Sequence, residues 1–384
     1  MSGLFPTYAR WEVEPAKAIG SYLYDKNDKK YLDFTSGIGV CNLGHQPEAV
    51  KKAVQIQLDQ FWHVSNLFPQ EKQVLAAKML ADAAGLEAVF FANSGAEANE
   101  GAIKLARKAT GRTKIITFQQ SFHGRTFATM SATGQDKIKE GYGNMLESFV
   151  YVPYNDITSL KAEMSHEVAA IMLEVIQGEG GIHVGEEPFL KEVEKLCKEY
   201  GALFVIDEIQ TGIGRTGKPF AFQQYDLSPD IVTSAKGLGS GFPIGAVIGT
   251  EKLVTFFGPG SHGSTFGGNP VSISAAIATM EEIFAPEFLE SVVQKGEYTK
   301  SLLEQELKDI SVVKEIRGSG LMIGVELQHS VGSLLKDLRE SGLLALPAGE
   351  NVLRLLPPLT ATEEQINEAV HIIKAVLHKS YITA

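Results

Sequence analysis

The middle of the chain reads Ala202-Leu-Phe-Val-Ile-Asp207-Glu-Ile-Gln210-Thr-Gly212. Five apolar residues followed by a carboxylate are typical of a buried parallel strand with Asp207 at its carboxyl end. In open α/β sheets ligands bind at that edge. An ionised carboxylate there needs a cation or hydrogen-bond donors nearby. The alternative is an aspartate that only begins a turn or caps a helix.

Similar apolar runs predict four more strands, at 89–92, 114–118, 169–173 and 231–233. Helical stretches separate them, the clearest being 187–200, which is charged on one side and apolar on the other. Buried strands that alternate with helices predict an α/β fold. Its mainly parallel sheet is expected to be covered by helices.

The chain changes character after about residue 270. Helices are expected at 271–284, 288–307 and 331–341, strands at 312–316, 321–327 and 352–356, and a last helix from Thr362, where Thr362-Glu-Glu-Gln365 fits a capping box. Two short strands, 21–25 and 30–34, are expected near the start. We therefore predict an N-terminal segment (1–50) that packs with the small domain, a large domain (51–270) and a smaller α+β domain (271–384).

Composition excludes several classes of protein. The 384 residues are 44% hydrophobic and 21% charged, which fits a large core. The net charge of −11 argues against nucleic acid or an acidic membrane as partners. Two cysteines and scattered histidines predict neither a disulfide framework nor a metal site. No stretch resembles a secretory signal or a membrane span, so we expect a cytoplasmic protein.

Two further stretches suggest chemistry. In Phe90-Phe-Ala-Asn-Ser94-Gly-Ala-Glu97-Ala98 a strand leads into a helix, whose N-terminus offers a seat for phosphate. The alternative is merely a well-capped helix. In Asp230-Ile-Val-Thr-Ser-Ala-Lys236-Gly237 a lysine follows a strand and opens a glycine-rich loop. A desolvated lysine can attack an aldehyde, whereas a solvated turn lysine is the alternative.

Together, a phosphate seat, a carboxylate and a nucleophilic lysine are what pyridoxal 5′-phosphate (PLP) requires. A competing motif, Gly212-Ile-Gly-Arg-Thr-Gly217, matches GxGxxG. Gly212 to Lys218 also matches the GxxxxGK of a phosphate-binding loop, but Pro219 stands where that loop needs Ser or Thr, and no helix pattern follows. A nucleotide-binding module on this loop is the weaker, non-enzymatic alternative.

Ordered motifs along nearly the whole chain resemble class III aminotransferases of PLP fold type I. They are Asn93-Ser-Gly-Ala-Glu-Ala98, Ser121-Phe-His-Gly-Arg-Thr126, Gln177-Gly-Glu-Gly-Gly181, Asp207 to Gly217, Ser234-Ala-Lys-Gly237 and His262-Gly-Ser-Thr-Phe-Gly-Gly-Asn269.

The resemblance implies a role for each matching residue. Lys236 would bond to the cofactor and shuttle the proton, and Asp207 would pair with its pyridine nitrogen. The other expected cofactor contacts are Gln210 to the ring oxygen, Ser94, Gly95 and Ala96 to the phosphate, Phe122 on the ring, and Thr265 to the phosphate held by the partner subunit, with Ser264 near the substrate. A homodimer with shared active sites is therefore expected.

Two arginines and a glutamate are expected to bind substrates. Arg125 would clamp the distal carboxylate and Arg354 the α-carboxylate of glutamate, with Glu179 neutralising Arg354 when the amino donor lacks that group. A surface Arg354 on an alternating strand is the alternative from the residues alone.

Among class III members, the chain is most similar to those that transfer the δ-amino group of N2-acetylornithine to 2-oxoglutarate in arginine biosynthesis. Ornithine, succinyldiaminopimelate and 4-aminobutyrate are alternative amino donors. An aminomutase or racemase on the same scaffold is an alternative enzyme class. Two departures from the family pattern are Val175, where proline is expected, and Cys41-Asn42, expected at a variable place in the substrate pocket.

Overall fold

The computed structural model describes residues 3–381. Its largest sheet has seven strands, in the spatial order β4 (Ala88–Ala92), β12 (Gly245–Gly249), β11 (Ile231–Ser234), β10 (Leu203–Asp207), β7 (Val168–Leu173), β5 (Lys114–Phe118) and β6 (Phe149–Val152). The strands from β11 to β6 run parallel, whereas β12 is antiparallel to both of its neighbours. The predicted α/β class with a mainly parallel sheet is confirmed.

Strands β6 and β12 are absent from the expected elements. The sequence of β12, Gly-Ala-Val-Ile-Gly, has only three apolar side chains between two glycines. A run this short does not stand out from a turn by its pattern alone. It forms a strand here because β4 and β11 supply hydrogen-bonding partners on both sides.

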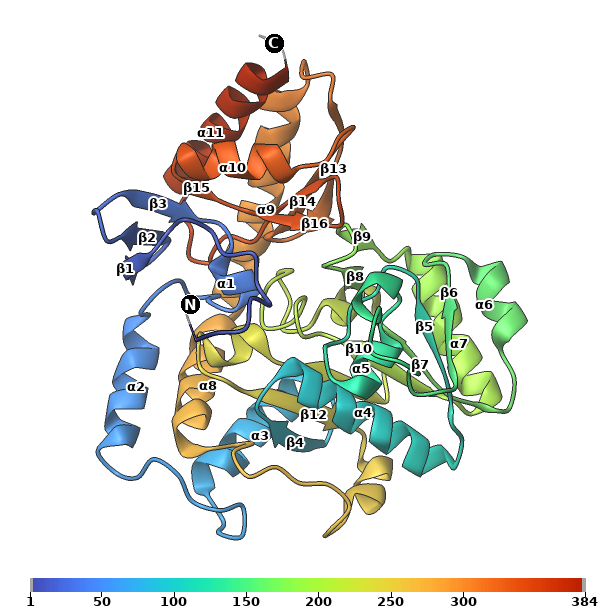
Figure 1. Cartoon of the computed structure of the whole chain (residues 1–384). Helices are drawn as coiled ribbons and strands as arrows, with labels where there is room; N and C mark the ends of the chain where they lie inside the picture. The colour runs from blue at the N-terminus through green and yellow to red at the C-terminus, as the bar shows by residue number, and fades with distance from the viewer. Residues whose placement is uncertain (1–2, 382–384) are drawn as a thin grey trace.

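Helices cover both faces of this sheet (Figure 1). Alternate residues of a strand point to opposite faces, and β10 shows the result. Leu203 and Val205 join the core beneath α4 (Gly95–Thr110), whereas Phe204 and Ile206 join the core beneath α7 (Glu187–Tyr200). The remaining helices of this part are α2 (Glu48–Leu58), α3 (Glu71–Ala84), α5 (Phe127–Ala132), α6 (Ile157–Glu163) and α8 (Pro270–Ile283).

A second, smaller unit follows. Its antiparallel sheet has the order β13 (Val313–Ser319), β14 (Met322–Leu327), β17 (Val352–Leu355) and β16 (Leu346–Ala348). Helices α9 (Pro286–Leu307), α10 (Gly332–Glu340) and α11 (Glu363–Tyr381) belong to it. At α11 the predicted capping box forms in full, because Thr362 and Gln365 exchange backbone-to-side-chain hydrogen bonds.

The N-terminal strands join this smaller unit (Figure 1). Strands β1 (Pro15–Ile19), β2 (Tyr22–Asp25) and β3 (Lys30–Asp33) form a sheet whose β3 edge pairs in parallel with β15 (Leu343–Leu344). Leu32 and Phe34 therefore lie in the hydrophobic core of the smaller unit. Helix α8 packs instead in the core beneath α7 of the large sheet, through Ile273 and its neighbours. The domain boundaries drawn at 50 and 270 stay a prediction.

Short elements connect these units. They are α1 (Ser36–Gly39), β8 (Ile176–Gln177), β9 (His183–Val184) and the 3₁₀ turns η1 (Asp136–Ile138), η2 (Ala221–Tyr225), η3 (Lys236–Gly239) and η4 (Glu251–Phe257). Each helix within residues 3–381 is too short or too polar to serve as a membrane span.

Candidate active site

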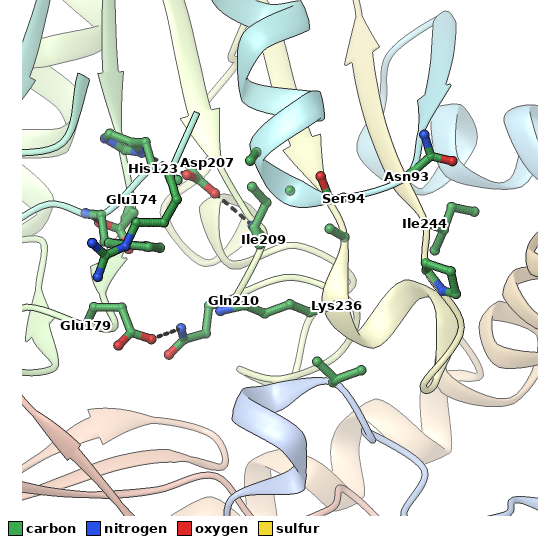
Figure 2. Close-up of a pocket in the computed structure, with 18 of the residues that line it drawn as sticks. Asn93, Ser94, His123, Glu174, Glu179, Asp207, Ile209, Gln210, Lys236 and Ile244 are labelled. Atoms are coloured by element: carbon green, nitrogen blue, oxygen red, sulfur yellow. Dashed lines mark hydrogen bonds and ion pairs between the residues drawn. The ribbon is translucent and has the colours of Figure 1, made fainter. Parts of the chain in front are cut away.

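A cavity of about 420 Å³ opens where β10 and β11 end and α4 begins (Figure 2). This volume suits a small organic ligand. Nine of the predicted site residues line it: Ser94, Gly95, Ala96, Phe122, Arg125, Glu179, Asp207, Gln210 and Lys236. Sequence positions 94 to 236 therefore meet at one edge of the sheet, as expected of parallel strands.

The start of α4 forms one wall of the cavity. Ser94 is the N-cap residue, and its Oγ accepts from the backbone N–H of Glu97 (3.2 Å). Only half of a capping box forms, because the Glu97 carboxylate accepts from the N–H of Asn93 (2.8 Å). A Cβ at Gly95 would lie 2.8 Å from Ile209, so glycine permits the close packing. The N–H groups of a first helical turn lack intrahelical partners and favour an anion.

Asp207 is 3% exposed at the end of β10. Its Oδ2 accepts from Asn99 Nδ2 (2.8 Å) and lies 2.8 Å from His123 Nδ1, while Oδ1 accepts from the N–H of Ile209 (3.0 Å). Burial by itself would lower the pKa of His123, but the bond to Asp207 raises that pKa above its ordinary value. The carboxylate thus has the partners that its burial requires, and a mere turn or cap aspartate is not what the structure contains.

Asn99 and His123 were not among the predicted site residues. Asn99 is fully buried among the apolar residues of α4, and its Nδ2 also donates to the carbonyl of His123 (2.7 Å). An asparagine in the apolar stripe of a helix is the signal that could have found it. His123 lies within the motif around Phe122, yet its partner is 84 positions away in sequence.

Lys236 follows β11 and begins η3 with a φ of 43°. A left-handed conformation is strained for a residue with a side chain and is typical of functional positions. The side chain lines the cavity and extends toward Gln210 (Figure 2). Burial lowers the pKa of Lys236, although the nearby Glu179 carboxylate acts to raise it. A lowered pKa makes the neutral, nucleophilic amine easier to form.

Arg354, on β17, is 2% exposed, so the alternative of a surface arginine is wrong. Its two terminal nitrogens lie 2.6 and 3.0 Å from the two carboxylate oxygens of Glu179. Nη1 also donates to the carbonyl of Gly178 and to Gln210 Oε1, each at 2.9 Å. Burial acts to raise the pKa of Glu179, but Arg354 lowers it to about 2. Arg354 itself does not line the cavity, but it is held beside the lining residues Glu179 and Gln210 with its charge neutralised.

Phe122 and Arg125 face the cavity from the loop after β5. Arg125 is exposed, and its guanidinium carbon lies 5.8 Å from the centroid of the Phe122 ring. Glu174 was not predicted. Its Oε2 accepts from the N–H of Phe122 (3.0 Å) and its Oε1 from that of Gly178 (3.4 Å). Burial raises the pKa of Glu174 to about 7.

Ser264 and Thr265 do not line this cavity. Ser264 Oγ accepts from Asn93 Nδ2 (3.0 Å), which places it beside the rim, and Thr265 is exposed. Cys41 and Asn42, expected at the substrate pocket, do not line this cavity either. Asn42 is 1% exposed and bonds to Arg215 and Ile213 because it is packed behind the lysine loop.

The loop with the GxGxxG pattern does not resemble a phosphate site. Residues Gly212 to Gly217 are buried, and a 3₁₀ turn, η2, follows in place of an α-helix. Val175, at the position where proline was expected, is fully buried in the core beneath α7.

Comparisons with known proteins agree with this geometry. The family model described as Aminotransferase class-III matches residues 7–377. The chain is 57% identical to an acetylornithine aminotransferase of Bacillus subtilis (strain 168), with 100% of both chains covered. The structure of an N-acetylornithine aminotransferase from Stenotrophomonas maltophilia K279a matches with a TM-score of 0.87 and 34% identity over 98% of each chain. The structure of an ornithine aminotransferase from Toxoplasma gondii ME49 matches with a TM-score of 0.95 and 30% identity over 100% of this chain and 94% of the other. The chain therefore belongs to the class-III aminotransferase family.

Proposed function

We propose that this chain transfers the δ-amino group of N2-acetyl-L-ornithine to 2-oxoglutarate. The products are N-acetyl-L-glutamate 5-semialdehyde and L-glutamate, in a step of arginine biosynthesis. The full-length similarity to acetylornithine aminotransferases supports the choice of donor. The observation that carries the proposal is the pairing of buried Arg354 with the partly exposed Glu179 near Lys236, because it offers a carboxylate site that can be closed.

The groups around the cavity fit PLP. An anion seat at the start of α4, a buried and fully partnered carboxylate, and a lysine with a lowered pKa meet in one space. When bound, PLP supplies an electron sink for the bond that breaks at the substrate carbon. Class III aminotransferases use this cofactor, and we propose that this chain does too.

Each residue of the cavity then has a task. Asp207 would hold a proton on the pyridine nitrogen, and Ser94 and the first N–H groups of α4 would hold the phosphate. Phe122 would stack on the ring and Gln210 would bond its oxygen. Lys236 Nζ would bind the aldehyde carbon and later move a proton between the substrate carbon and C4′ of the cofactor.

Two substrates must use one cavity in turn. Arg125 would bind the α-carboxylate of acetylornithine or the γ-carboxylate of glutamate, since both lie far from the reacting amine. Arg354 would bind the α-carboxylate of glutamate after Glu179 has moved aside. With acetylornithine bound, no carboxylate lies next to the reacting amine, and Glu179 would keep Arg354 neutralised.

We also propose a homodimer, in which Thr265 reaches the phosphate in the partner subunit. Exposed apolar side chains lie on the two segments that meet beside Thr265, namely Trp62, Leu67 and Phe68 on one and Phe266 on the other. Ring contact between His63 and Phe266, 5.1 Å between centroids, joins these two segments. A patch of this kind favours burial against a second copy. Location in the cytoplasm stays a prediction.

The test is a set of half-reaction rates for the PLP-loaded protein. The visible absorbance of the chromophore should be lost faster with acetylornithine than with ornithine, succinyldiaminopimelate or 4-aminobutyrate. The high TM-score to an ornithine aminotransferase makes ornithine the strongest competitor. Borohydride treatment followed by peptide mapping should modify Lys236 and leave the Lys236→Ala variant unlabelled. A faster rate with another donor would overturn the substrate, turnover without an amino acceptor would indicate a mutase or racemase, and an unlabelled Lys236 would overturn the whole proposal.

A further inference from the structure

Arg215 is a fully buried arginine whose charge no carboxylate neutralises within residues 3–380. It donates instead to three neutral oxygens, the carbonyls of Leu321 and Pro357 and the side chain of Asn42 (2.8 Å). Burial lowers the pKa of Arg215 to about 9, so it stays charged at neutral pH. A buried charge without a counter-ion costs several kcal/mol, a cost that a space-filling apolar residue would avoid.

The three acceptors come from distant parts of the chain. Leu321 and Pro357 belong to the smaller unit, whereas Arg215 follows β10 of the large sheet. The backbone bond from the N–H of Leu321 to the carbonyl of Arg215 (3.0 Å) reinforces the connection. Arg215 therefore fixes the position of the smaller unit relative to the loop after Asp207.

Asn42 extends this connection toward the lysine. Its side-chain Nδ2 donates to the backbone carbonyl of Ile213 (2.8 Å), and the backbone carbonyl of Asn42 accepts from the N–H of Leu359 (2.7 Å). A Cβ at Gly237 would lie 2.3 Å from Asn42 Nδ2, so the amide packs directly against the backbone there. Gly237 immediately follows Lys236, whose φ of 43° is strained. The amide thus packs against a backbone segment that holds an unfavourable conformation.

We propose that Asn42, clamped by Arg215, is a positioning residue that holds the backbone at Lys236–Gly237 and thereby aims the Lys236 amine into the cavity. The inference rests on the proposed function, since it assigns no new ligand. Through Arg215 the same clamp makes the aim of Lys236 depend on the placement of the smaller unit. Substrate contacts at Arg125, Glu179 and Arg354 do not pass through Asn42.

The main test compares Asn42→Ala with wild type and with Asn367→Ala. The control removes a partly buried amide that accepts from Tyr298 Oη (2.8 Å) in the smaller unit. Asn42→Ala should lower kcat about 10-fold because misplacement of a reacting group is costly, with KM for both substrates within about twofold of wild type. Water admitted beside Gly237 should also raise the pH midpoint of the chromophore spectrum, measured without substrates, by about half a unit or more. Asn367→Ala should change neither quantity.

A double-mutant cycle sharpens the test. Gly237→Ala should lower kcat because its Cβ collides with Asn42, and adding Asn42→Ala should remove that collision. The double variant should be no slower than Asn42→Ala alone. Should Asn42→Ala not fold, Asn42→Ser leaves a smaller cavity and carries the same expectations.

The proposal is overturned if Asn42→Ala lowers only the thermal midpoint, with kcat and the spectral midpoint unchanged, or if the two substitutions act additively. If wild type itself leaves Lys236 unlabelled by borohydride, the proposed function has failed instead. The two failures are therefore distinguishable.

Discussion

The wall of the cavity formed by α4 and β10 and the wall formed by β17 and the loop after β8 each hold buried charge, but in different ways. In the first wall, the side chains of Asp207 and His123 are 4% and 0% exposed, and their bonds run to other buried groups. In the second wall, Arg354 is 2% exposed but its partner Glu179 is 28% exposed, so solvent reaches the carboxylate. We expect the sealed pair to keep its partners, and we propose that an incoming carboxylate displaces the solvent-exposed Glu179 from Arg354. On this comparison, the first wall would keep the same contacts in both half-reactions, whereas the second wall would change its ion pair between them.

The largest effect is expected in the sealed wall, from Asp207→Ala. It leaves His123 and Asn99 without their shared acceptor, and breaking a buried pair costs about 3–5 kcal/mol. We expect kcat to fall about 10³-fold, and the thermal midpoint and PLP affinity to fall with it. Asp230→Ala is the control, because Asp230 pairs with Lys252 near the start of β11, away from the cavity. Retention of kcat within tenfold in Asp207→Ala would remove the assigned role.

In the exchangeable wall, Glu179→Ala should separate the two half-reactions. Without Glu179, the charge of Arg354 would be compensated by the α-carboxylate when glutamate is bound, but not when acetylornithine is bound. A lost bond to a charged group is worth about 2 kcal/mol, or about 30-fold, so the acetylornithine half-reaction should slow by that factor. The glutamate half-reaction should change less than about threefold. Glu326→Ala, which removes a partner of Arg317, is the control. Equal losses in single-turnover rates would show that Glu179 does not switch.

Arg125→Lys tests whether one exposed clamp serves both substrates. Lysine keeps the charge but loses the two-pronged geometry. KM for acetylornithine and for 2-oxoglutarate should each rise about fivefold, with kcat little changed. Arg107→Lys is the matched control, because Arg107 also lies over a phenylalanine ring, that of Phe149, at 5.5 Å. A rise confined to one substrate would mean that the clamp is not shared.

The smallest effect concerns Glu208, which is fully buried directly after Asp207 and bonded to Thr211 and Phe222. Burial raises the pKa of Glu208 to about 7 from 4.5. Between these two values the folded state binds more protons than the unfolded state, so its contribution to stability falls as pH rises from about 4.5 to 7 and stays lost above. The free energy of unfolding of Glu208→Gln minus that of wild type should therefore be about 1–3 kcal/mol larger at pH 8 than at pH 4. Thermal melts of both proteins at the two pH values measure this. A difference independent of pH would show that Glu208 is not a buried acid of raised pKa.

Local pattern was sufficient for much of the fold and for the three chemical signals. The strand ending at Asp207 and the helix 187–200 are found where their apolar periodicity predicts, because burial on known faces leaves a regular trace in sequence. Ser94, Asp207 and Lys236 could be predicted to share one site because parallel strands bring their carboxyl ends to one edge of the sheet. The individual roles came from the family resemblance and stay proposals.

Partnerships between distant residues left no such trace. Asn99 meets Asp207 across 108 positions and Arg215 meets Asn42 across 173. The pairing of Arg354 with Glu179, 175 positions apart, was expected only from the family resemblance. Asn42 illustrates the limit, since the family resemblance suggested the substrate pocket, whereas its neighbours in space are Arg215 and Gly237.

By itself, then, the sequence determined the class of fold, the edge of the sheet that carries the chemistry and the kinds of group available there. Packing of the two units decided which charges are sealed, which can change partner and which backbone supports Lys236. The physical reason is range. Periodicity and turn chemistry act over a few residues, whereas desolvation and pairing of a buried charge depend on whatever the folded chain brings within hydrogen-bond distance.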